Sequence, residues 1–439
     1  MMADMFTAKR SGRSGLPRRQ FLLATLVALI SLTLLGPAMT VVDSAGVTGE
    51  GSPIRQIGYI VIALMALYAI RPLDSLDRVL CVPIGIVITL AWCWLSLGWA
   101  IDPAISLRRV LLTTIIIWTI FAVVRQLGYQ QVMLVLRIAF VIALLVNFLT
   151  VLMFPQIGIH QANEPYDKAL IGDWRGFMLQ KNLVGSVCAI TIIVFTFDAK
   201  RIPKALRAVV IALAAFFLFK TESKTSLALC AFAIGLAAVF QFYSARYRVF
   251  VLSTIFLLAI VVAVLVGVYN DPLLQHLNDP TALTGRTRIW SALASYASDH
   301  PWTGSGYGSF WNIGAASPIY QYSNGWVLTV TQGHNGYLDV VSQTGVPGLL
   351  LVVGAVIVYP LVRLLASPLA QGPRGALILG VFMFCIAHNV TESSIFDRDT
   401  LVEVFLMMTI ALLWTITRAT PRRGQGDNRL FGNTATRAR

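Results

Sequence analysis

Apolar stretches long enough to cross a lipid bilayer recur along the whole chain, separated by polar breaks. A helix needs about 20 mainly apolar residues to span the hydrocarbon core of a membrane. Apolar residues make up 57% of the 439 positions and charged residues only 12%, about half the charged fraction of a soluble domain. The sequence therefore predicts an all-α, polytopic membrane protein and excludes a soluble protein with a large apolar core.

Polar breaks divide these stretches into twelve predicted transmembrane helices, nine before one long polar segment and three after it. We expect the helices over residues 21–42, 54–70, 79–99, 109–124, 132–153, 183–197, 205–219, 225–242, 249–268, 337–361, 375–390 and 401–417. The predicted organisation is a basic cytoplasmic tail, helices one to nine, a large periplasmic loop, helices ten to twelve and a disordered cytoplasmic tail. These parts cover residues 1–20, 21–268, 269–336, 337–417 and 418–439.

Lysine and arginine predict the orientation, because they are enriched in the cytoplasmic loops of membrane proteins. With a cytoplasmic N-terminus, 22 of the 34 fall in inward segments and 11 in outward segments, while Arg137 lies inside a predicted helix. This bias predicts an even number of helices with both termini in the cytoplasm. Lys9–Arg19 followed by Phe21–Val42 resembles a signal sequence, but its apolar part is long, so we expect a retained first helix.

The net charge of +14 could suggest a nucleic-acid partner. The basic residues, however, lie in short loops between helices and in the two tails, where membrane topology explains them, so we exclude nucleic acid. The five cysteines fall inside apolar stretches, and neither a CxxC pair nor an HExxH motif occurs. The sequence therefore gives no support for a disulfide framework, a metal site or a cofactor.

The predicted loop 269–336 is far longer than a connection between two helices requires. It is rich in tryptophan, tyrosine, glycine and serine, as in GSGYGSF at residues 304–310. Aromatic rings mixed with small polar groups suit sugars, whose C–H faces stack on aromatic faces. An aromatic belt at the membrane interface is an equally good interpretation of the composition.

Several cations at the ends of predicted helices face outward, against the general charge bias. They are Arg175, Lys181, Lys220, Lys224, Arg286 and Arg288. Cations gathered at the outer leaflet would suit an anionic head group such as a phosphate or diphosphate. Alternatively, the nearby carboxylates Asp173, Glu222 and Glu392 pair with them, and the lysines snorkel from helix ends.

Among the five histidines, His334 has the best position for chemistry, because it lies where the polar loop meets the predicted helix 337–361. A histidine of ordinary pKa can accept a proton at neutral pH. The structural alternative is that the pair His334–Asn335 only caps the helix. His388 could orient Glu392 or merely pair with it.

Several segments in this order resemble the O-antigen ligase and polysaccharide polymerase superfamily, and within it the exopolysaccharide-production polymerases. The resemblance covers residues 94 to 417 approximately, and one large outer loop precedes HNGYLD, as in that family. The matching segments are WLSLGWAIDPAISLRR (94–109), GFMLQKN (176–182), SKTSLAL (223–229), GRTRIW (285–290), DHPWTGSGYGSFW (299–311), HNGYLDVVSQTGVPG (334–348) and NVTESS (389–394).

This resemblance implies a bacterial inner-membrane enzyme that transfers sugar from a polyprenyl-diphosphate-linked saccharide to an acceptor glycan, without a metal. Carried over by motif, Arg286 would hold the diphosphate and His334 would act as the base. Arg175, Lys181, Lys224, Arg288 and Glu392 are the further candidate substrate-binding residues. Lysines stand where ligases of the family more often have arginine, and Lys224 in SKTS is typical of the polymerase branch.

Three functions remain open from the sequence. The first is a polymerase that joins lipid-linked repeat units, working with membrane lipid, a flippase and a chain-length regulator as possible partners. The second is a ligase that moves a finished glycan to another acceptor. The third is a lipid-linked-oligosaccharide flippase or another transporter, for which Arg137 inside a helix would be an argument, although the two halves show no evident repeat.

Overall fold

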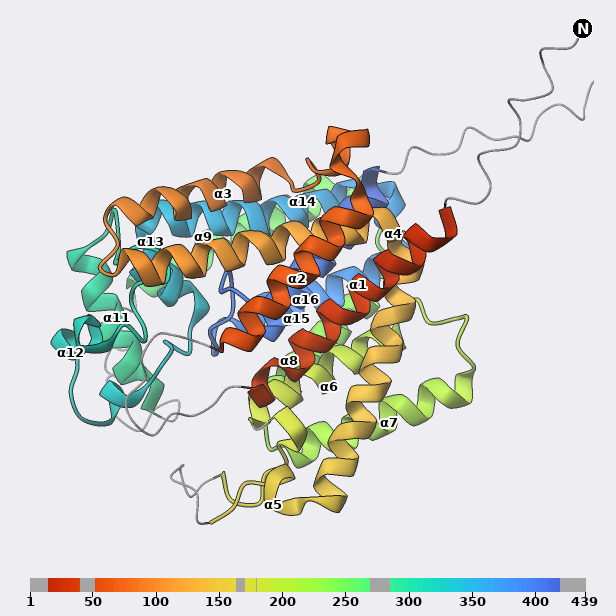
Figure 1. Ribbon diagram of the computed structural model, residues 1–439, viewed down its shortest axis with the longest axis horizontal. Helices are drawn as coiled ribbons and strands as arrows, with labels where there is room; N and C mark the ends of the chain where they lie inside the picture. The colour runs from red at the N-terminus through yellow and green to blue at the C-terminus, as the bar shows by residue number, and fades with distance from the viewer. Residues whose placement is uncertain (1–14, 40–51, 163–169, 179, 269–284, 419–439) are drawn as a thin grey trace, which may run out of the picture.

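The computed structural model describes residues 15–39, 52–162, 170–178, 180–268 and 285–418 (Figure 1). Within these ranges the chain is helical, and its only extended pairing is an isolated bridge between Ile159 and Trp174. The predicted all-α class is confirmed for this part of the chain. Most of the two predicted tails, and residues 269–284 of the predicted loop, lie outside the described residues.

Every one of the twelve predicted ranges falls on a helix. Before the polar segment the helices are α1 (Gly15–Leu35), α2 (Pro53–Ile70), α3 (Ile84–Leu95), α4 (Pro103–Met153), the short α5 (Pro155–Gly158), α6 (Lys181–Thr196), α7 (Lys204–Lys220), α8 (Lys224–Phe240) and α9 (Arg248–Val268). After it come α11 (Arg286–Asp299), α12 (Ile319–Tyr322), α13 (Gly336–Val352), α14 (Tyr359–Ala366), α15 (Gly372–His388) and α16 (Leu401–Arg418). A π-helical turn, Val353–Val358, joins α13 to α14.

Two predicted helices, 109–124 and 132–153, form the single element α4. Its backbone departs from helical φ and ψ only at Gly128, where φ is +73° and ψ is 169° and the helix is kinked. Glycine can adopt this left-handed backbone conformation without a steric penalty. One glycine is therefore enough to turn the chain between the two arms of α4, where the sequence predicted a short loop.

Five described helical segments are long and apolar enough to cross a membrane: Arg18–Ala38, Pro53–Asp74, Pro103–Met153, Gly336–Ala366 and Leu401–Arg418. The bent pair of α8 with the start of α9, at an angle of 104°, would be a sixth. Three other apolar helices are shorter, at 10–17 residues. A multi-pass membrane protein is thus supported, while twelve separate crossings remain a prediction.

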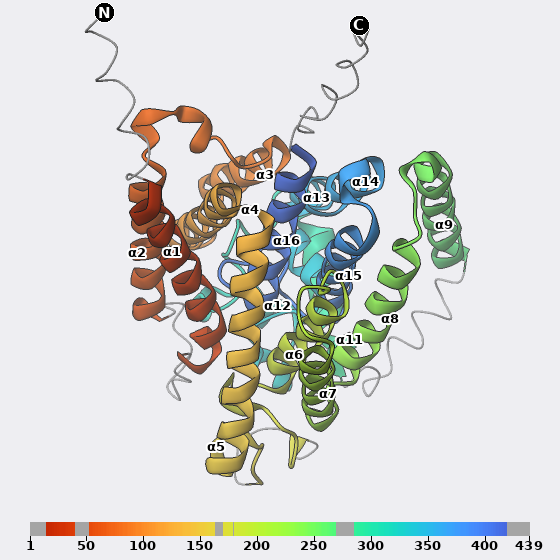
Figure 2. The same cartoon turned by 90° about the vertical axis from the view of Figure 1, so that its right-hand side faces the viewer.

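The loops separate into two groups at opposite ends of the bundle (Figure 2). At one end Arg18 donates to the carbonyl of Ile70, and Tyr129 donates to Asp198. At the other end Arg55 pairs with Asp399 at 2.6 Å. Each of these contacts joins two segments that the sequence analysis places on the same membrane face, as an alternating topology requires. Which face is cytoplasmic remains a prediction.

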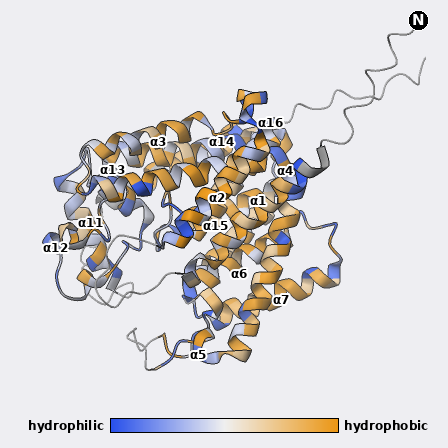
Figure 3. Cartoon of the chain, viewed as in Figure 1, coloured by the Kyte–Doolittle hydropathy of each residue, from blue (hydrophilic) through white to orange (hydrophobic). Residues whose placement is uncertain are grey.

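Helix α16 lies at the centre of the bundle, packed against α4 and α15, and most of its side chains are buried. The outer helices instead expose large apolar side chains, such as Leu64 on α2, Leu149 on α4 and Phe219 on α7. Figure 3 shows hydrophobic residues along almost the full length of these helices. Apolar residues around the whole helix are expected where lipid replaces water as the solvent. The five cysteines are buried and unpaired, as predicted.

The described part of the polar segment folds into a small unit of its own beside α13. Helix α11 lies against α13, and Ile289, Leu293, Phe310 and Val327 form a buried apolar cluster. Figures 1 and 3 show this unit, with α11 and α12, at one end of the bundle, where hydrophilic residues gather. The aromatic residues of the loop thus supply a core as well as a surface.

Candidate active site

Glu392 is the centre of a buried polar cluster formed by four separate segments. Its Oε1 accepts hydrogen bonds from the Arg286 guanidinium and the Asn182 amide, both at 2.8 Å. Its Oε2 lies 3.1 Å from Nδ1 of His334. The Glu392 residue is only 7% exposed. Glu392, a predicted substrate-binding residue, therefore contacts both His334, the predicted base, and Arg286, the predicted diphosphate ligand.

The turn after α15 holds Glu392 in place through backbone contacts. The Asn389 side-chain oxygen accepts from the backbone N–H groups of Ser394 and Ile395, which closes the turn. The N–H of Gly336 donates to the carbonyls of both Asn389 and Glu392. A side chain at Gly336 would collide with the Asn389 amide, so glycine is required for the turn to approach the start of α13 this closely.

His334 is separated from the capping role that its sequence position allowed. Asn335 is the N-cap of α13, because its side chain accepts from the N–H groups of Tyr337 and Leu338. His334 has φ of +49°, a left-handed conformation that costs a non-glycine residue about 1–3 kcal/mol. This backbone directs the imidazole towards Glu392, and the side chain remains 23% exposed.

The electrostatics of Glu392 determine how His334 is hydrogen-bonded. Burial alone would raise the pKa of Glu392, but the hydrogen bond from His334 and the charge of Arg286 outweigh it and lower that pKa to about 2. Glu392 is therefore a carboxylate at neutral pH and can only accept hydrogen bonds. Nδ1 of His334 must carry the proton of this bond, which leaves Nε2 of a neutral imidazole with a lone pair.

Four helices begin around this cluster. They are α6 at Lys181, α8 at Lys224, α11 at Arg286 and α13 at Gly336. No side chain caps the N-terminus of α6, α8 or α11 by a hydrogen bond. The positive end of the helix dipole attracts anions at such positions. The convergence of these helix starts adds positive potential that the sequence analysis did not anticipate.

Lys181 and Lys224 lie at the border of the cluster. Lys181 pairs with Asp173 at 2.6 Å, which confirms the simple ion pair that the sequence allowed as an alternative. Lys224 is exposed and directly follows Ser223, whose hydroxyl donates to the Asn182 oxygen at 3.1 Å. Both lysines therefore flank the residue that bonds Glu392.

Arg175 and Arg288 are directed elsewhere. The buried guanidinium of Arg175 donates to the carbonyls of Ile157, at 2.7 Å, and Gln156, at 3.4 Å, and so ties down the turn at α5. Arg288 is two positions from Arg286 on α11, so the two side chains leave the helix on different faces. It donates to the Asn324 side chain at 3.1 Å in an exposed groove. Substrate binding by these two arginines remains a prediction.

Sequence reasoning missed Asn182 and the pair His388–Ser186. Asn182 ends the GFMLQKN segment, but no local pattern shows that it reaches a carboxylate 210 positions away. His388 Nε2 lies 2.9 Å from the Ser186 hydroxyl, which in turn donates to the Asn182 carbonyl. Within the described ranges, no group of three or more His, Cys, Asp or Glu side chains could hold a metal ion.

Comparison with known proteins finds similarity to one family over part of the chain. The family model described as O-antigen ligase matches residues 208–353, about a third of the chain. This match supports a relationship to the O-antigen ligase and polysaccharide polymerase superfamily. The matched residues include Lys224, Arg286 and His334, whereas Asn182 and Glu392 lie outside them.

A curated relative is the exopolysaccharide production protein ExoQ of Rhizobium meliloti (strain 1021). It is 25% identical over 193 residues, which cover 42% of this chain and 44% of the relative. The similarity thus spans less than half the length of either protein.

Proposed function

We propose that this protein is a membrane glycosyltransferase that polymerises polyprenyl-diphosphate-linked oligosaccharide units into an exopolysaccharide on the periplasmic face. The observation that carries the proposal is the convergence of Arg286 and His334 on Glu392, where four helices begin. A proton acceptor and an anion-attracting region lie side by side there, as glycosyl transfer from a diphosphate requires.

In the proposed reaction the acceptor hydroxyl oxygen attacks the anomeric carbon of the donor sugar. The bond from that carbon to the diphosphate oxygen breaks, the hydroxyl proton passes to Nε2 of His334, and polyprenyl diphosphate leaves. Attack opposite the leaving group inverts the anomeric configuration. A positioned base contributes typically about 10²–10⁴-fold to such a step, and Glu392 fixes the tautomer that this base needs.

The leaving diphosphate gains negative charge as its bond to the sugar breaks. Arg286, the exposed Lys224 and the uncapped N-termini of α6, α8 and α11 would stabilise that charge. Such groups increase the rate when they interact more strongly with the transition state than with the bound donor. Because the Arg286 guanidinium is already anchored by Glu392 and Thr391, it needs no reorientation during the reaction.

The ligase function uses the same chemistry and is favoured by the description of the matching family model. The printed name of the curated relative, exopolysaccharide production protein, and Lys224 in the SKTS segment favour the polymerase. A flippase that delivers the donor and a chain-length regulator are the proposed protein partners, with membrane lipid around the donor tail.

A deletion strain complemented with single variants tests the proposal. The His334→Ala variant should produce no polymer and should accumulate lipid-linked single repeat units on the periplasmic side. His300→Ala is the matched control, because His300 lies in the same outer segment but is stacked on Tyr296, with the ring centroids 4.4 Å apart. It should produce normal polymer.

Three other results would contradict the polymerase. Polymer that forms but lacks its final acceptor would indicate the ligase. Single units that stay on the cytoplasmic side would indicate the transporter. Normal polymer from His334→Ala, with the variant present in the membrane at the wild-type level, would remove His334 from the reaction.

A further inference from the structure

A narrow cavity lies next to the Glu392 cluster. Loop residues 393–398, which directly follow Glu392 in the chain, form part of its wall. Gln332, Gly336 and Ser393, which neighbour His334 and Glu392 in sequence, contribute to its wall. Its open space is only about 40 Å³, enough for a few water-sized groups but not for a sugar ring. Any ligand group that enters this inner cavity must therefore be small.

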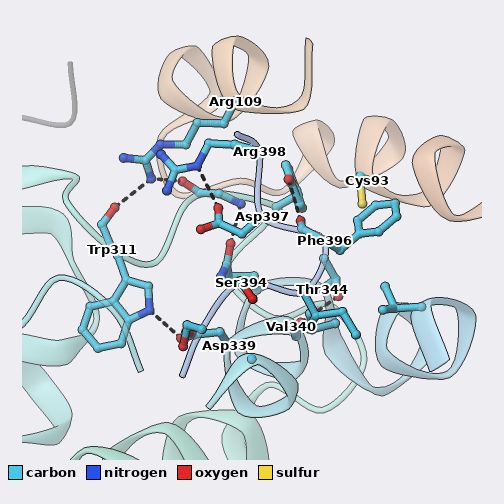
Figure 4. A pocket seen from close by; sticks show the side chains of 18 of the residues that line it. Cys93, Arg109, Trp311, Asp339, Val340, Thr344, Ser394, Phe396, Asp397 and Arg398 are labelled. Carbon is cyan, nitrogen blue, oxygen red and sulfur yellow. Dashed lines mark hydrogen bonds and ion pairs between the residues drawn. The ribbon is translucent and has the colours of Figure 1, made fainter. Parts of the chain in front are cut away.

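Two arginines line the inner cavity close to each other, Arg109 from α4 and Arg398 from the loop before α16 (Figure 4). Their charges repel, and two carboxylates line the same cavity, Asp397 beside the arginines and Asp339 at the Trp311 indole. Arg109 is 5% exposed, and its terminal nitrogens donate to backbone carbonyls of residues 308, 311 and 312. Its Nε has no hydrogen-bond partner among the described residues, so it is a buried donor that an acceptor group of a ligand would satisfy.

The terminal amino groups of Arg398 are positioned for such a group. Its Nε donates to Asp397 at 2.8 Å, and this is the one hydrogen bond of its guanidinium within the described part of the chain. The Arg398 side chain is 32% exposed, so the remaining fork of N–H donors is accessible. A planar fork of this kind matches a carboxylate, which it can bind through two parallel hydrogen bonds.

A second, wider cavity of about 260 Å³ lies beyond Trp311. Trp311 and Thr331 line both cavities, so the inner and the outer cavity adjoin at these residues. The Trp311 ring is held in place, because its indole N–H donates to Asp339 at 2.6 Å. The outer cavity is lined by Tyr320, Ser317 and Thr329 among others, a mixture of aromatic and hydroxyl groups that suits a sugar.

We propose that the outer cavity binds a sugar unit of the acceptor glycan and that the inner cavity receives a carboxylate carried by that unit, held by Arg398 and Arg109. This inference rests on the proposed glycosyl transfer, since it places the acceptor beside His334. It assigns a substrate class, a glycan with carboxylate-bearing sugars. The two arginines would act on the binding and the register of the acceptor, not on the departing diphosphate.

Binding to the whole protein in phosphatidylcholine nanodiscs tests this assignment. The probe is the repeat oligosaccharide released from the strain's own polysaccharide, used in its native form and after chemical reduction of its carboxyl groups to alcohols. Wild type should bind the native form at least about tenfold more tightly than the reduced form, because charged hydrogen bonds are lost. Arg398→Gln should abolish this difference, whereas Arg398→Lys should keep part of it.

Two variants serve as controls. Arg108→Gln removes a neighbouring arginine that lines neither cavity and should bind both forms as the wild type does. Thr329→Trp, at an exposed position of the outer cavity, should weaken binding of the native and the reduced form equally.

Equal affinity of wild type for the two forms would overturn the assignment, as would a polysaccharide without carboxyl groups. Displacement of the native form by an equal concentration of inorganic phosphate would also overturn it, because the arginines would then serve a phosphate. Binding is measured without turnover. Loss of polymerisation in His334→Ala with intact carboxylate-dependent binding, or the reverse, therefore separates this inference from the proposed function.

Discussion

Replacing Glu392 by glutamine should damage both the stability and the activity of the protein, because the carboxylate holds three partners at once. The glutamine keeps the size of the side chain but removes the charge that pairs with Arg286 at 2.8 Å. It also introduces N–H donors where Glu392 now only accepts hydrogen bonds. The Arg286 side chain, 18% exposed, would be left without its counter-charge.

The magnitude can be obtained in two independent ways. The fall in the pKa of Glu392 from 4.5 to about 2 corresponds to roughly 3 kcal/mol of interaction favouring the charged form. Removal of one partner of a buried ion pair typically costs about 3–5 kcal/mol. We therefore expect Glu392→Gln to lower the free energy of unfolding by about 3 kcal/mol.

Unfolding of the purified protein in a mild detergent, followed by loss of tryptophan fluorescence, measures this effect. Glu222→Gln is the matched control, because Glu222 is an exposed carboxylate on the same face of the bundle. It should change stability by less than about 0.5 kcal/mol. The double variant Arg286→Gln with Glu392→Gln should be less destabilised than the sum of the two single variants, since the unpaired charge is gone. Additive effects would refute a direct Arg286–Glu392 interaction.

Further predictions concern pH, packing, charge and topology. Because the folded-state pKa of Glu392 lies below its ordinary value, its stabilisation is complete above about pH 4.5 and disappears as the pH falls towards 2. Wild type should lose thermal stability over this interval more steeply than Glu392→Gln, and parallel curves would contradict the assignment. Gly308 has φ of +69°, and a methyl group there would lie 2.8 Å from Cδ of Arg109, so Gly308→Ala should lower the melting temperature. Gly314→Ala is the control, because Gly314 has φ of +65° but open space around it. The control measures the cost of the backbone conformation alone. Lys224→Gln should raise the apparent KM for the lipid-linked donor, whereas the equally exposed Lys220→Gln, at the end of α7, should leave it unchanged. A phosphatase reporter fused after Ser317 should report a periplasmic position, and a cytoplasmic signal would reverse the proposed orientation.

The helices could be predicted from the sequence because lipid imposes a simple rule on the chain. A span must be apolar over its whole length, so hydropathy alone located all twelve helical ranges, although it could not show that a single residue, Gly128, separates two of them. The periodicity of α11 also separates Arg286 from Arg288, a consequence that the sequence analysis did not draw.

Only part of the candidate site could be predicted, because Glu392 at its centre contacts residues that are far away in the chain. Arg286 and His334 could be found from local motifs, but Asn182 and Glu392 are joined across 210 positions. Arg109 is one of the 11 lysines and arginines counted in the outward segments, and nothing local shows that its guanidinium reaches the carbonyl of Trp311 at 2.7 Å. For Arg175, likewise, nothing local shows that its guanidinium is buried and donates to the carbonyl of Ile157.

A carboxylate at the centre of a site proposed for a diphosphate has a physical reason. Glu392 offsets the charge of Arg286 before the donor arrives, so the site does not bind the doubly charged lipid carrier with the full strength of an unpaired arginine. More negative charge appears on the leaving group as the glycosidic bond breaks, so a partly neutralised cation still favours the transition state over the bound donor. The same carboxylate binds Nδ1 of His334 and so holds the imidazole with Nε2 available to the acceptor hydroxyl. In the proposed reaction Glu392 would thereby couple the proton acceptor to the cation that binds the diphosphate. It would also favour release of the spent carrier after each transfer, as a repeating polymerisation requires.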